Sequence, residues 1–277
     1  MNTAWKRGSE WHRWDPHLHT PGTALNDQFG RDWTRYLDVI ESARPTVEAL
    51  GVTDYCTISG YKEFLKHRAS GRASNVTFAF PNVEFRLEVQ TEKKRGINLH
   101  LLFSSEDRNH VREIERLLGE LKFEYKARSY GCTPQELAEF GRAIDPKQSD
   151  ETGAFKVGVE QFKLDFKQLK RLFADDRWMR ENCLVAVEAG ETDGTAGLQK
   201  DGAFKALREE LCAAYPTVGS RMSASRTSAA GSSPPTTSVL RTAFGTTGRR
   251  SPHCLRACAA SCFSCSISPS TSGTCVR

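Results

Sequence analysis

The sequence predicts an α/β fold, in which strands of a sheet or barrel alternate with helices along the chain. Five short segments are rich in β-branched and aliphatic residues and are bounded by turn-forming residues: 13–18, 49–53, 76–80, 97–103 and 183–188. Between them, apolar residues recur at the spacing of amphipathic helices. Strands that alternate with helices favour parallel strands under a helical layer. No internal repeat is visible.

Four helices are expected between and after these strands. Pro45 ends the first helix, and Thr133 with Glu136 forms a capping box that opens the third, which continues to Ile144. The expected apolar faces are Trp33, Tyr36, Leu37 and Ile40 in the first helix, Val111, Ile114, Leu117, Leu118 and Leu121 in the second, and Phe162, Phe166, Leu169 and Phe173 in the fourth.

The chain divides into two parts of different composition. Residues 1–218 carry 32 basic and 34 acidic side chains and form the predicted domain. Residues 219–277 hold seven Arg, no Lys, Asp or Glu, and 14 Ser, without apolar periodicity. This composition predicts a disordered tail, because it buries too little apolar surface to offset chain entropy. Its abrupt start after FKALREELCAAY is also typical of a shifted reading frame, which is the interpretation we favour.

Several classes of protein are excluded. No run approaches the length of a membrane span, and the N-terminus lacks the apolar segment of a signal peptide, so a cytoplasmic location is expected. The four cysteines of the predicted domain lie far apart and are interpreted as reduced thiols: Cys56, Cys132, Cys183 and Cys212. The tail cysteines have no hydrophobic frame that would hold a metal loop.

Polar residues with metal-binding side chains follow or interrupt four successive strands. Asp15, His17 and His19 alternate in the stretch WDPHLHTPG, so in a regular strand they share one face. The others are Asp54 after ALGVT, Glu84 after VTFAFPN, and His100 within INLHLLF. Because functional residues of parallel sheets gather at the carboxyl ends of strands, we expect these groups to converge on a metal site.

Each candidate has a structural alternative. Asp54 could cap the next turn, Glu84 could be a solvated carboxylate, and His100 could be a hydrogen-bonded core histidine. His12, His67 and His110 are expected at the surface. The basic runs Lys93, Lys94 and Arg95, and Lys163, Lys167, Lys170 and Arg171, are interpreted as solvated faces.

The order of these motifs resembles a known family. D-P-H-L-H-T at 15–20, G-V-T-D-Y at 51–55, N-V-E at 82–84 and N-L-H at 98–100 are similar to successive motifs of the PHP domain, named for polymerase and histidinol phosphatase. The stretch RWDPHLHTPGTALNDQFG looks most like PHP domains that precede an AAA-type ATPase. The resemblance covers about residues 10–212.

The resemblance implies a distorted seven-stranded (β/α)7 barrel that holds two or three divalent metals, with Mn, Zn, Fe and Mg as candidates. It assigns His17 and His19 as paired ligands, Glu84 as a bridging carboxylate and His100 as the next ligand. Asp15 would orient a histidine. The implied chemistry is hydrolysis of a phosphoester, with nucleic acid among the candidate substrates, and a downstream ATPase region is expected in intact relatives.

The chain departs from the family pattern in three places. Tyr55 stands where many members have histidine. A later histidine motif has no clear counterpart, with Glu188, Glu191 and Asp193 as candidates to stand in for it, and a final Asp-x-His motif is missing. No G-x-x-x-x-G-K-[ST] phosphate loop is present either. We therefore expect an incomplete barrel with weak or absent activity.

Three functions remain open from the sequence. The first is a metal-dependent phosphoesterase that acts on nucleotides or nucleic acid, with Asp15 and Asp54 assisting the metal ligands. The second is a non-catalytic scaffold that metals stabilise and that binds a partner or nucleic acid. The third is a phosphatase for a small metabolite, as in hydrolysis of histidinol phosphate.

Overall fold

The computed structural model describes residues 13–90 and 96–187. The predictions for His12, Cys212, the residues Glu188, Glu191 and Asp193, and the tail 219–277 lie outside these ranges. The described elements are β1 (Arg13–His19), α1 (Trp33–Ser42), β2 (Val47–Tyr55), α2 (Ser59–Ala69), β3 (Phe78–Gln90), β4 (Gly96–Phe103), α3 (His110–Glu120), β5 (Lys122–Tyr125), β6 (Arg128–Gly131), α4 (Pro134–Ile144), α5 (Glu151–Gln161), α6 (Phe166–Asp175), α7 (Arg177–Asn182) and β7 (Cys183–Val187).

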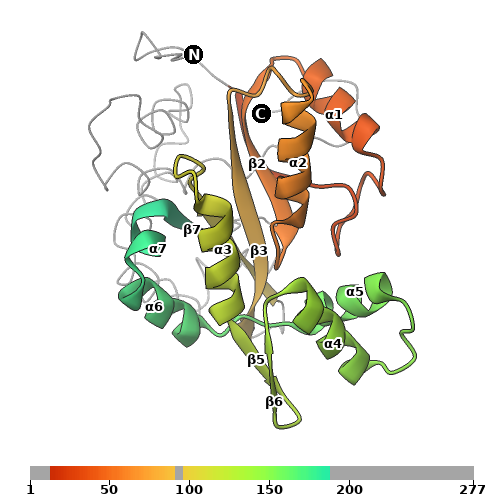
Figure 1. The fold of residues 1–277 in the computed structure, drawn as a ribbon, viewed down its shortest axis with the longest axis vertical. Coiled ribbons are helices and arrows are strands. Elements are labelled where there is room, and N and C mark those ends of the chain that lie inside the picture. The colour runs from red at the N-terminus through yellow and green to blue at the C-terminus, as the bar shows by residue number, and fades with distance from the viewer. Residues whose placement is uncertain (1–12, 91–95, 188–277) are drawn as a thin grey trace, which may run out of the picture.

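The predicted α/β class is confirmed. A five-stranded sheet has the order β1-β2-β3-β4-β7, and a separate hairpin is formed by β5 and β6. Helices α2 and α3 lie against the sheet in Figure 1, while α4 and α5 pack beside the hairpin. Within the described residues the sheet is open and forms no closed barrel.

The expectation of an all-parallel sheet is wrong at β4. Strands β1, β2 and β3 are parallel, but β4 runs antiparallel to both β3 and β7. The link between β3 and β4 is only a few residues long, whereas a parallel connection needs a crossover of a dozen or more. His100 therefore does not lie at the carboxyl end of a parallel strand.

The first three predicted helices are confirmed and the fourth is wrong in part. The Thr133 hydroxyl accepts a hydrogen bond from the Glu136 backbone, as predicted, but the Glu136 carboxylate accepts from the Gly131 backbone N–H instead of completing a capping box with Thr133. Phe162 terminates α5 instead of opening α6, although it is buried like the other three residues of the predicted face. Helices α2, α5 and α7 and the β5–β6 hairpin were not predicted from the sequence.

A bulge in β1 depends on Gly51 in β2. Asp15 pairs with Leu50 and Leu18 pairs with Val52, so Pro16 and His17 together oppose the single residue Gly51. A Cβ atom on Gly51 would lie 2.0 Å from the Pro16 carbonyl oxygen. Only glycine leaves room for the bulged backbone at this position.

We predict that Gly51→Ala lowers the free energy of unfolding by about 3 kcal/mol, because the bulge must move away from β2. Gly119→Ala in α3 is the control, since its Cβ would meet only the Thr133 methyl group at 3.9 Å. Its stability should change by less than about 1 kcal/mol. Denaturant unfolding of both variants checks this, and equal stabilities would contradict the role of Gly51.

Candidate metal centre

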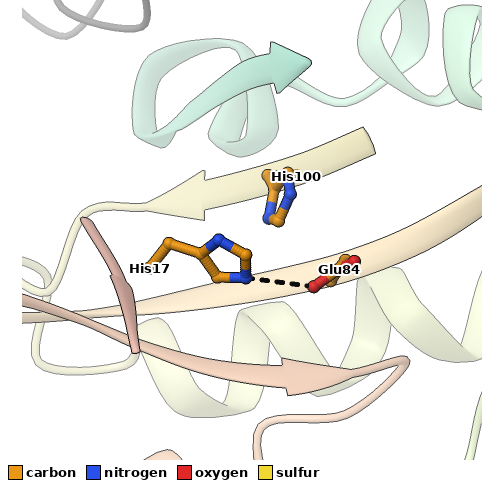
Figure 2. Close-up of side chains that lie close together, drawn as sticks. All are labelled: His17, Glu84 and His100. Carbon is orange, nitrogen blue, oxygen red and sulfur yellow. Dashed lines mark hydrogen bonds and ion pairs between the residues drawn. The ribbon is translucent and has the colours of Figure 1, made fainter. Parts of the chain in front are cut away.

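Three strands present His17, Glu84 and His100 toward one another (Figure 2). Potential ligand atoms of these three residues lie within 4.8 Å of one another. The sheet register brings them together, because Glu84 pairs with Tyr55 of β2 on one side and with His100 of β4 on the other. His100 reaches the cluster through antiparallel pairing, in place of the strand-end position that the sequence suggested.

His19 completes the cluster. Its Nε2 atom lies 3.1 Å from His17 Nε2 and 3.3 Å from Glu84 Oε2, and His17 Nε2 lies 3.2 Å from the same carboxylate oxygen. The ring of His19 stacks on Tyr55 with centroids 5.1 Å apart. Donor atoms of a tetrahedral metal with bonds of about 2.0–2.1 Å are themselves about 3.3 Å apart, so this triangle has the size of a metal-ligand set.

The tautomer of His100 suits it for ligation. Asn82 Nδ2 donates a hydrogen bond to the Pro16 carbonyl oxygen (2.9 Å), which leaves Asn82 Oδ1 as an acceptor. His100 Nδ1, 3.1 Å from Asn82 Oδ1, must then carry the proton. In the neutral ring, Nε2 is consequently the nitrogen with the lone pair, as in metal-binding histidines whose other nitrogen donates to an oxygen.

Glu84 is ionised although it is buried. Burial alone would raise its pKa, but the charge of His100 and hydrogen bonds from His17 and His19 hold the pKa of Glu84 well below its ordinary value. The Glu84 side chain is only 1% exposed. An anionic oxygen surrounded by imidazole nitrogens is a donor set for Zn²⁺, Mn²⁺ or Fe²⁺.

The burial of the cluster also fits a bound cation. His19 is 7%, Glu84 1% and His100 0% exposed. Three imidazoles gathered around one carboxylate, with little exposure to water, are costly to bury unless something beyond the carboxylate compensates them. A divalent cation held by His17, His19, Glu84 and His100 fits this donor set.

The β1 bulge places Asp15 on the opposite face from His19. Asp15 aligns with Leu50, and His19 aligns with Thr53. A step of four residues in β1 therefore matches a step of three residues in β2, which moves the His19 side chain to the face opposite Asp15. The expectation that Asp15, His17 and His19 share one face is therefore wrong for Asp15. Its carboxylate accepts from the backbone N–H of His17 at 3.2 Å, so it contacts the bulge and not an imidazole ring.

Asp54 also lies away from the cluster, because its neighbours Thr53 and Tyr55 occupy the metal-facing positions of β2. It accepts hydrogen bonds from the Thr20 hydroxyl and, at 2.7 Å, from the backbone N–H of Gly60 at the start of α2. The capping alternative thus describes its contacts. Burial raises the pKa of Asp54 to about 7, against these hydrogen bonds.

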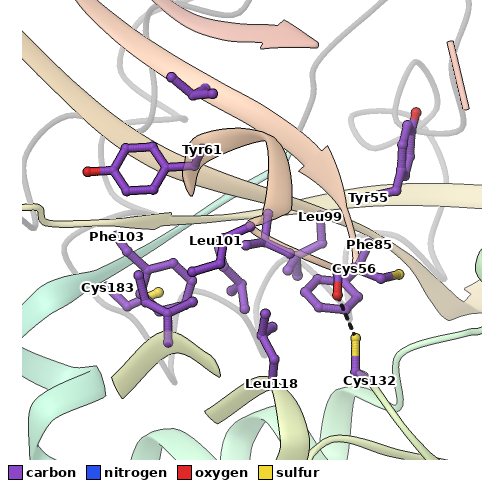
Figure 3. Packing of buried hydrophobic residues seen from close by; sticks show 14 of the residues in the cluster. Tyr55, Cys56, Tyr61, Phe85, Leu99, Leu101, Phe103, Leu118, Cys132 and Cys183 are labelled. Atoms are coloured by element: carbon purple, nitrogen blue, oxygen red, sulfur yellow. Dashed lines mark hydrogen bonds between the residues drawn. The ribbon is translucent and has the colours of Figure 1, made fainter. Parts of the chain in front are cut away.

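The two acids lie on the helix-covered side of the sheet. Burial raises the pKa of Asp15 to about 6, and the charges of Asp54 and Asp15 add to burial in raising the pKa of Tyr36 in α1. The same side carries the apolar residues Leu99 and Leu101, which pack near Leu118 of α3 (Figure 3). One face of the sheet is therefore apolar and carries the two acids with raised pKa values, and the other face carries the imidazoles.

Other histidines and cysteines lie apart from the cluster. The expectation of a surface position is wrong for His110, which is buried and contacts the Tyr61 hydroxyl and the Asp107 carbonyl oxygen. A helix start on a buried face explains this placement. His67 is half-buried against Trp33. Cys56, Cys132 and Cys183 are free thiols, as expected for the described part of the chain.

Asn82 also contributes to the centre, although it was not predicted from the sequence as a site residue. It precedes Glu84 by two residues and therefore has the same strand parity, which was the available signal. A cavity of about 430 Å³ is lined in part by Tyr55, which stacks on His19, but His17, His19, Glu84 and His100 do not line it. The cavity is also lined by Thr20, Arg31, Trp33 and Asp54.

The raised pKa of Asp54 predicts a pH effect on stability. Between about pH 4 and pH 7 the folded state binds the proton that the unfolded state has released, so this group makes the protein less stable as pH rises through that window. The contribution has an upper bound of about 4 kcal/mol. Asp54→Asn should flatten the slope, leaving the smaller contribution of Asp15, which has the same sign.

Denaturant unfolding at pH 4.5 and pH 8 measures this slope. Glu88→Gln, which removes an exposed carboxylate, is the control. If Asp54→Asn and the native chain lose the same stability between the two pH values, the assignment of the proton to Asp54 is wrong.

Within the described residues, no helix has both the length and the apolar character required to cross a membrane. A scan against protein-family models gives no match for this chain, and a search of curated proteins gives none either.

Proposed function

We propose that the chain is a metal-dependent phosphoesterase domain of PHP type, with the described sheet as part of an incomplete (β/α)7 barrel. The observation that carries this proposal is the convergence of His17 Nε2, His19 Nε2 and Glu84 Oε2 within 3.1–3.3 Å, with His100 on the adjoining strand. The order of the D-P-H-L-H-T, N-V-E and N-L-H motifs supports the same assignment.

The residues of the centre have separable roles. His17, His19, Glu84 and His100 would bind the cations, and Asn82 fixes the tautomer and the position of His100. Tyr55 packs against the His19 ring and limits its rotation. Bound divalent cations supply a Lewis acid that stabilises charge on phosphoryl oxygens and acidifies water. No side-chain nucleophile is required for this chemistry.

The charge of the centre favours a phosphoester over an uncharged substrate. The centre contains one carboxylate and three imidazoles, so bound cations would leave the site with a net positive charge. Such a site attracts a phosphate anion. Asp15 and Asp54, the acids proposed from the sequence to assist catalysis, support the bulge and the α2 start instead.

We expect the purified full chain to bind divalent cations and, with Mn²⁺ added, to hydrolyse bis(p-nitrophenyl) phosphate at a low but measurable rate, as an incomplete barrel implies. His17→Ala/His19→Ala should lose most of the bound metal and lower hydrolysis at least about 100-fold. A metal concentration 100 times the Kd should stabilise the native chain by about 2.7 kcal/mol but should not stabilise the double variant to that extent.

His67→Ala is the matched control, because His67 lies outside the centre against Trp33. Elemental analysis, thermal unfolding and release of p-nitrophenolate give three independent measurements. Metal binding and stabilisation without hydrolysis would contradict the phosphoesterase and favour the non-catalytic scaffold. Unchanged metal content in the double variant would contradict the site itself.

A further inference from the structure

Two basic residues continue the metal-facing side of the sheet beyond the centre. Arg86 follows Glu84 by two residues in β3, and the β3–β4 register between them is regular, so both side chains leave the same face. Two strand residues span roughly 7 Å. Arg86 is half-buried, which separates it from an ordinary solvated surface arginine.

Lys163 lies beside Arg86, although it is 77 positions later in the sequence. β2 ends at Tyr55, and the segment that follows α5 takes its place next to β3. Leu87 and Leu164 form a parallel bridge, with Leu164 N donating to the Arg86 carbonyl at 2.8 Å. One residue earlier, the same register sets Lys163 opposite Arg86.

The electrostatics agree with this placement. Burial lowers the pKa of Lys163, and the positive charge of Arg86 lowers it further. The charges of Glu84 and Arg86 act in opposite directions on the pKa of Tyr55, which pairs with Glu84 in the β2–β3 register. The prediction of a solvated basic face is therefore wrong for Lys163, because the β3 bridge, not α6, carries it.

Neither cation forms an ion pair with a carboxylate within the described residues, although the charge of Glu160 raises the pKa of Lys163. Lys163 Nζ donates to the Glu160 carbonyl oxygen at 2.6 Å, and Arg86 has no side-chain hydrogen bond there. Two half-buried positive charges that repel each other are unfavourable unless an anion accompanies them. The arginine fork and the lysine ammonium together provide donors that match phosphate oxygens.

We propose that Arg86 and Lys163 form a phosphate-binding subsite for a second phosphate of the substrate, next to the phosphate that reacts at the metal centre. This inference rests on the proposed function. The spacing along β3 is comparable to the separation of neighbouring phosphates in a polynucleotide strand. The substrate class is thus a nucleotide with two phosphates, as in an oligonucleotide or a nucleoside bisphosphate, and not a metabolite with one phosphate.

Two chromogenic substrates test the subsite. Thymidine 5′-(p-nitrophenyl phosphate) and its 3′-phosphorylated form both release p-nitrophenolate when water attacks the 5′ phosphorus, and they differ only in the second phosphate. The native chain should prefer the 3′-phosphorylated form about 10- to 100-fold in kcat/KM, mainly through KM. Arg86→Gln/Lys163→Gln should remove that preference and leave hydrolysis of the other substrate nearly unchanged.

Binding provides a readout that does not depend on hydrolysis. Calorimetry in the presence of a chelator should show thymidine 3′,5′-bisphosphate binding at least tenfold more tightly than the 5′-monophosphate, with the difference lost in the double variant. Arg112→Gln/Lys156→Gln, which changes two exposed cations, is the matched control and should behave as the native chain. Arg86→Lys/Lys163→Arg keeps both charges and should retain most of the difference.

The outcomes distinguish the two proposals. Hydrolysis without preference for the second phosphate, together with bisphosphate binding that Arg86→Gln/Lys163→Gln does not weaken, would overturn the subsite and leave the phosphoesterase standing. Selective bisphosphate binding without hydrolysis would support the subsite and contradict the phosphoesterase. Tetrathymidylate and thymidine 3′,5′-bisphosphate are compared as competitive inhibitors. The one that inhibits at the lower concentration identifies the substrate as a polynucleotide or as a mononucleotide, and either result supports the subsite.

Discussion

The bulge of β1 over Gly51 determines which polar side chains of the N-terminal strand meet and which are separated. One additional residue in β1 moves His19 to the face that carries Glu84 and His100, while Asp15 stays on the face covered by helices. The Pro16 carbonyl at the bulge also accepts from Asn82, which in turn holds His100. A single backbone irregularity thus connects the strand pairing, the orientation of a ligand and the composition of the site.

The pKa values of buried carboxyl groups are shifted in opposite directions on the two faces of the sheet. Glu84 stays ionised because imidazoles surround it, whereas Asp15 and Asp54 have raised pKa values because burial on the apolar side disfavours their charge. Buried Glu84 is therefore the carboxyl group that loses its proton most readily, whereas Asp15 and Asp54 keep theirs to higher pH. Only the imidazole-bearing face provides the negative oxygen that a divalent cation requires. That face also carries the basic pair of Arg86 and Lys163.

Much of this arrangement could be predicted from the sequence, and the remainder could not for identifiable reasons. Alternation along INLHLLF correctly separated His100 from its apolar neighbours, and the convergence of His17, His19, Glu84 and His100 is found in the structure. The bulge could not be predicted, because local parity gives no sign of an inserted residue. The antiparallel direction of β4 was signalled by the short link after β3, but the strand boundary at 76–80 concealed how short that link is.

Long-range contacts were beyond the reach of the sequence pattern. Phe162 fitted a helical apolar face, yet it ends α5, and the next residues bridge to β3. Lys163 was grouped with a helix for the same reason. His110 was assigned to the surface because nothing local indicates its contact with Tyr61 in α2. In each case the pairing of distant segments decides the environment of the side chain.

X-ray absorption of the zinc-loaded full chain tests most directly whether the four convergent side chains share a cation. If they do, the nearest ligand atoms are nitrogen and oxygen at about 2.0–2.1 Å, and the imidazole scattering falls in His17→Ala/His19→Ala but is unchanged in His67→Ala. A shell of sulfur at about 2.3 Å, from any of the nine cysteines, would place the metal elsewhere and contradict the account.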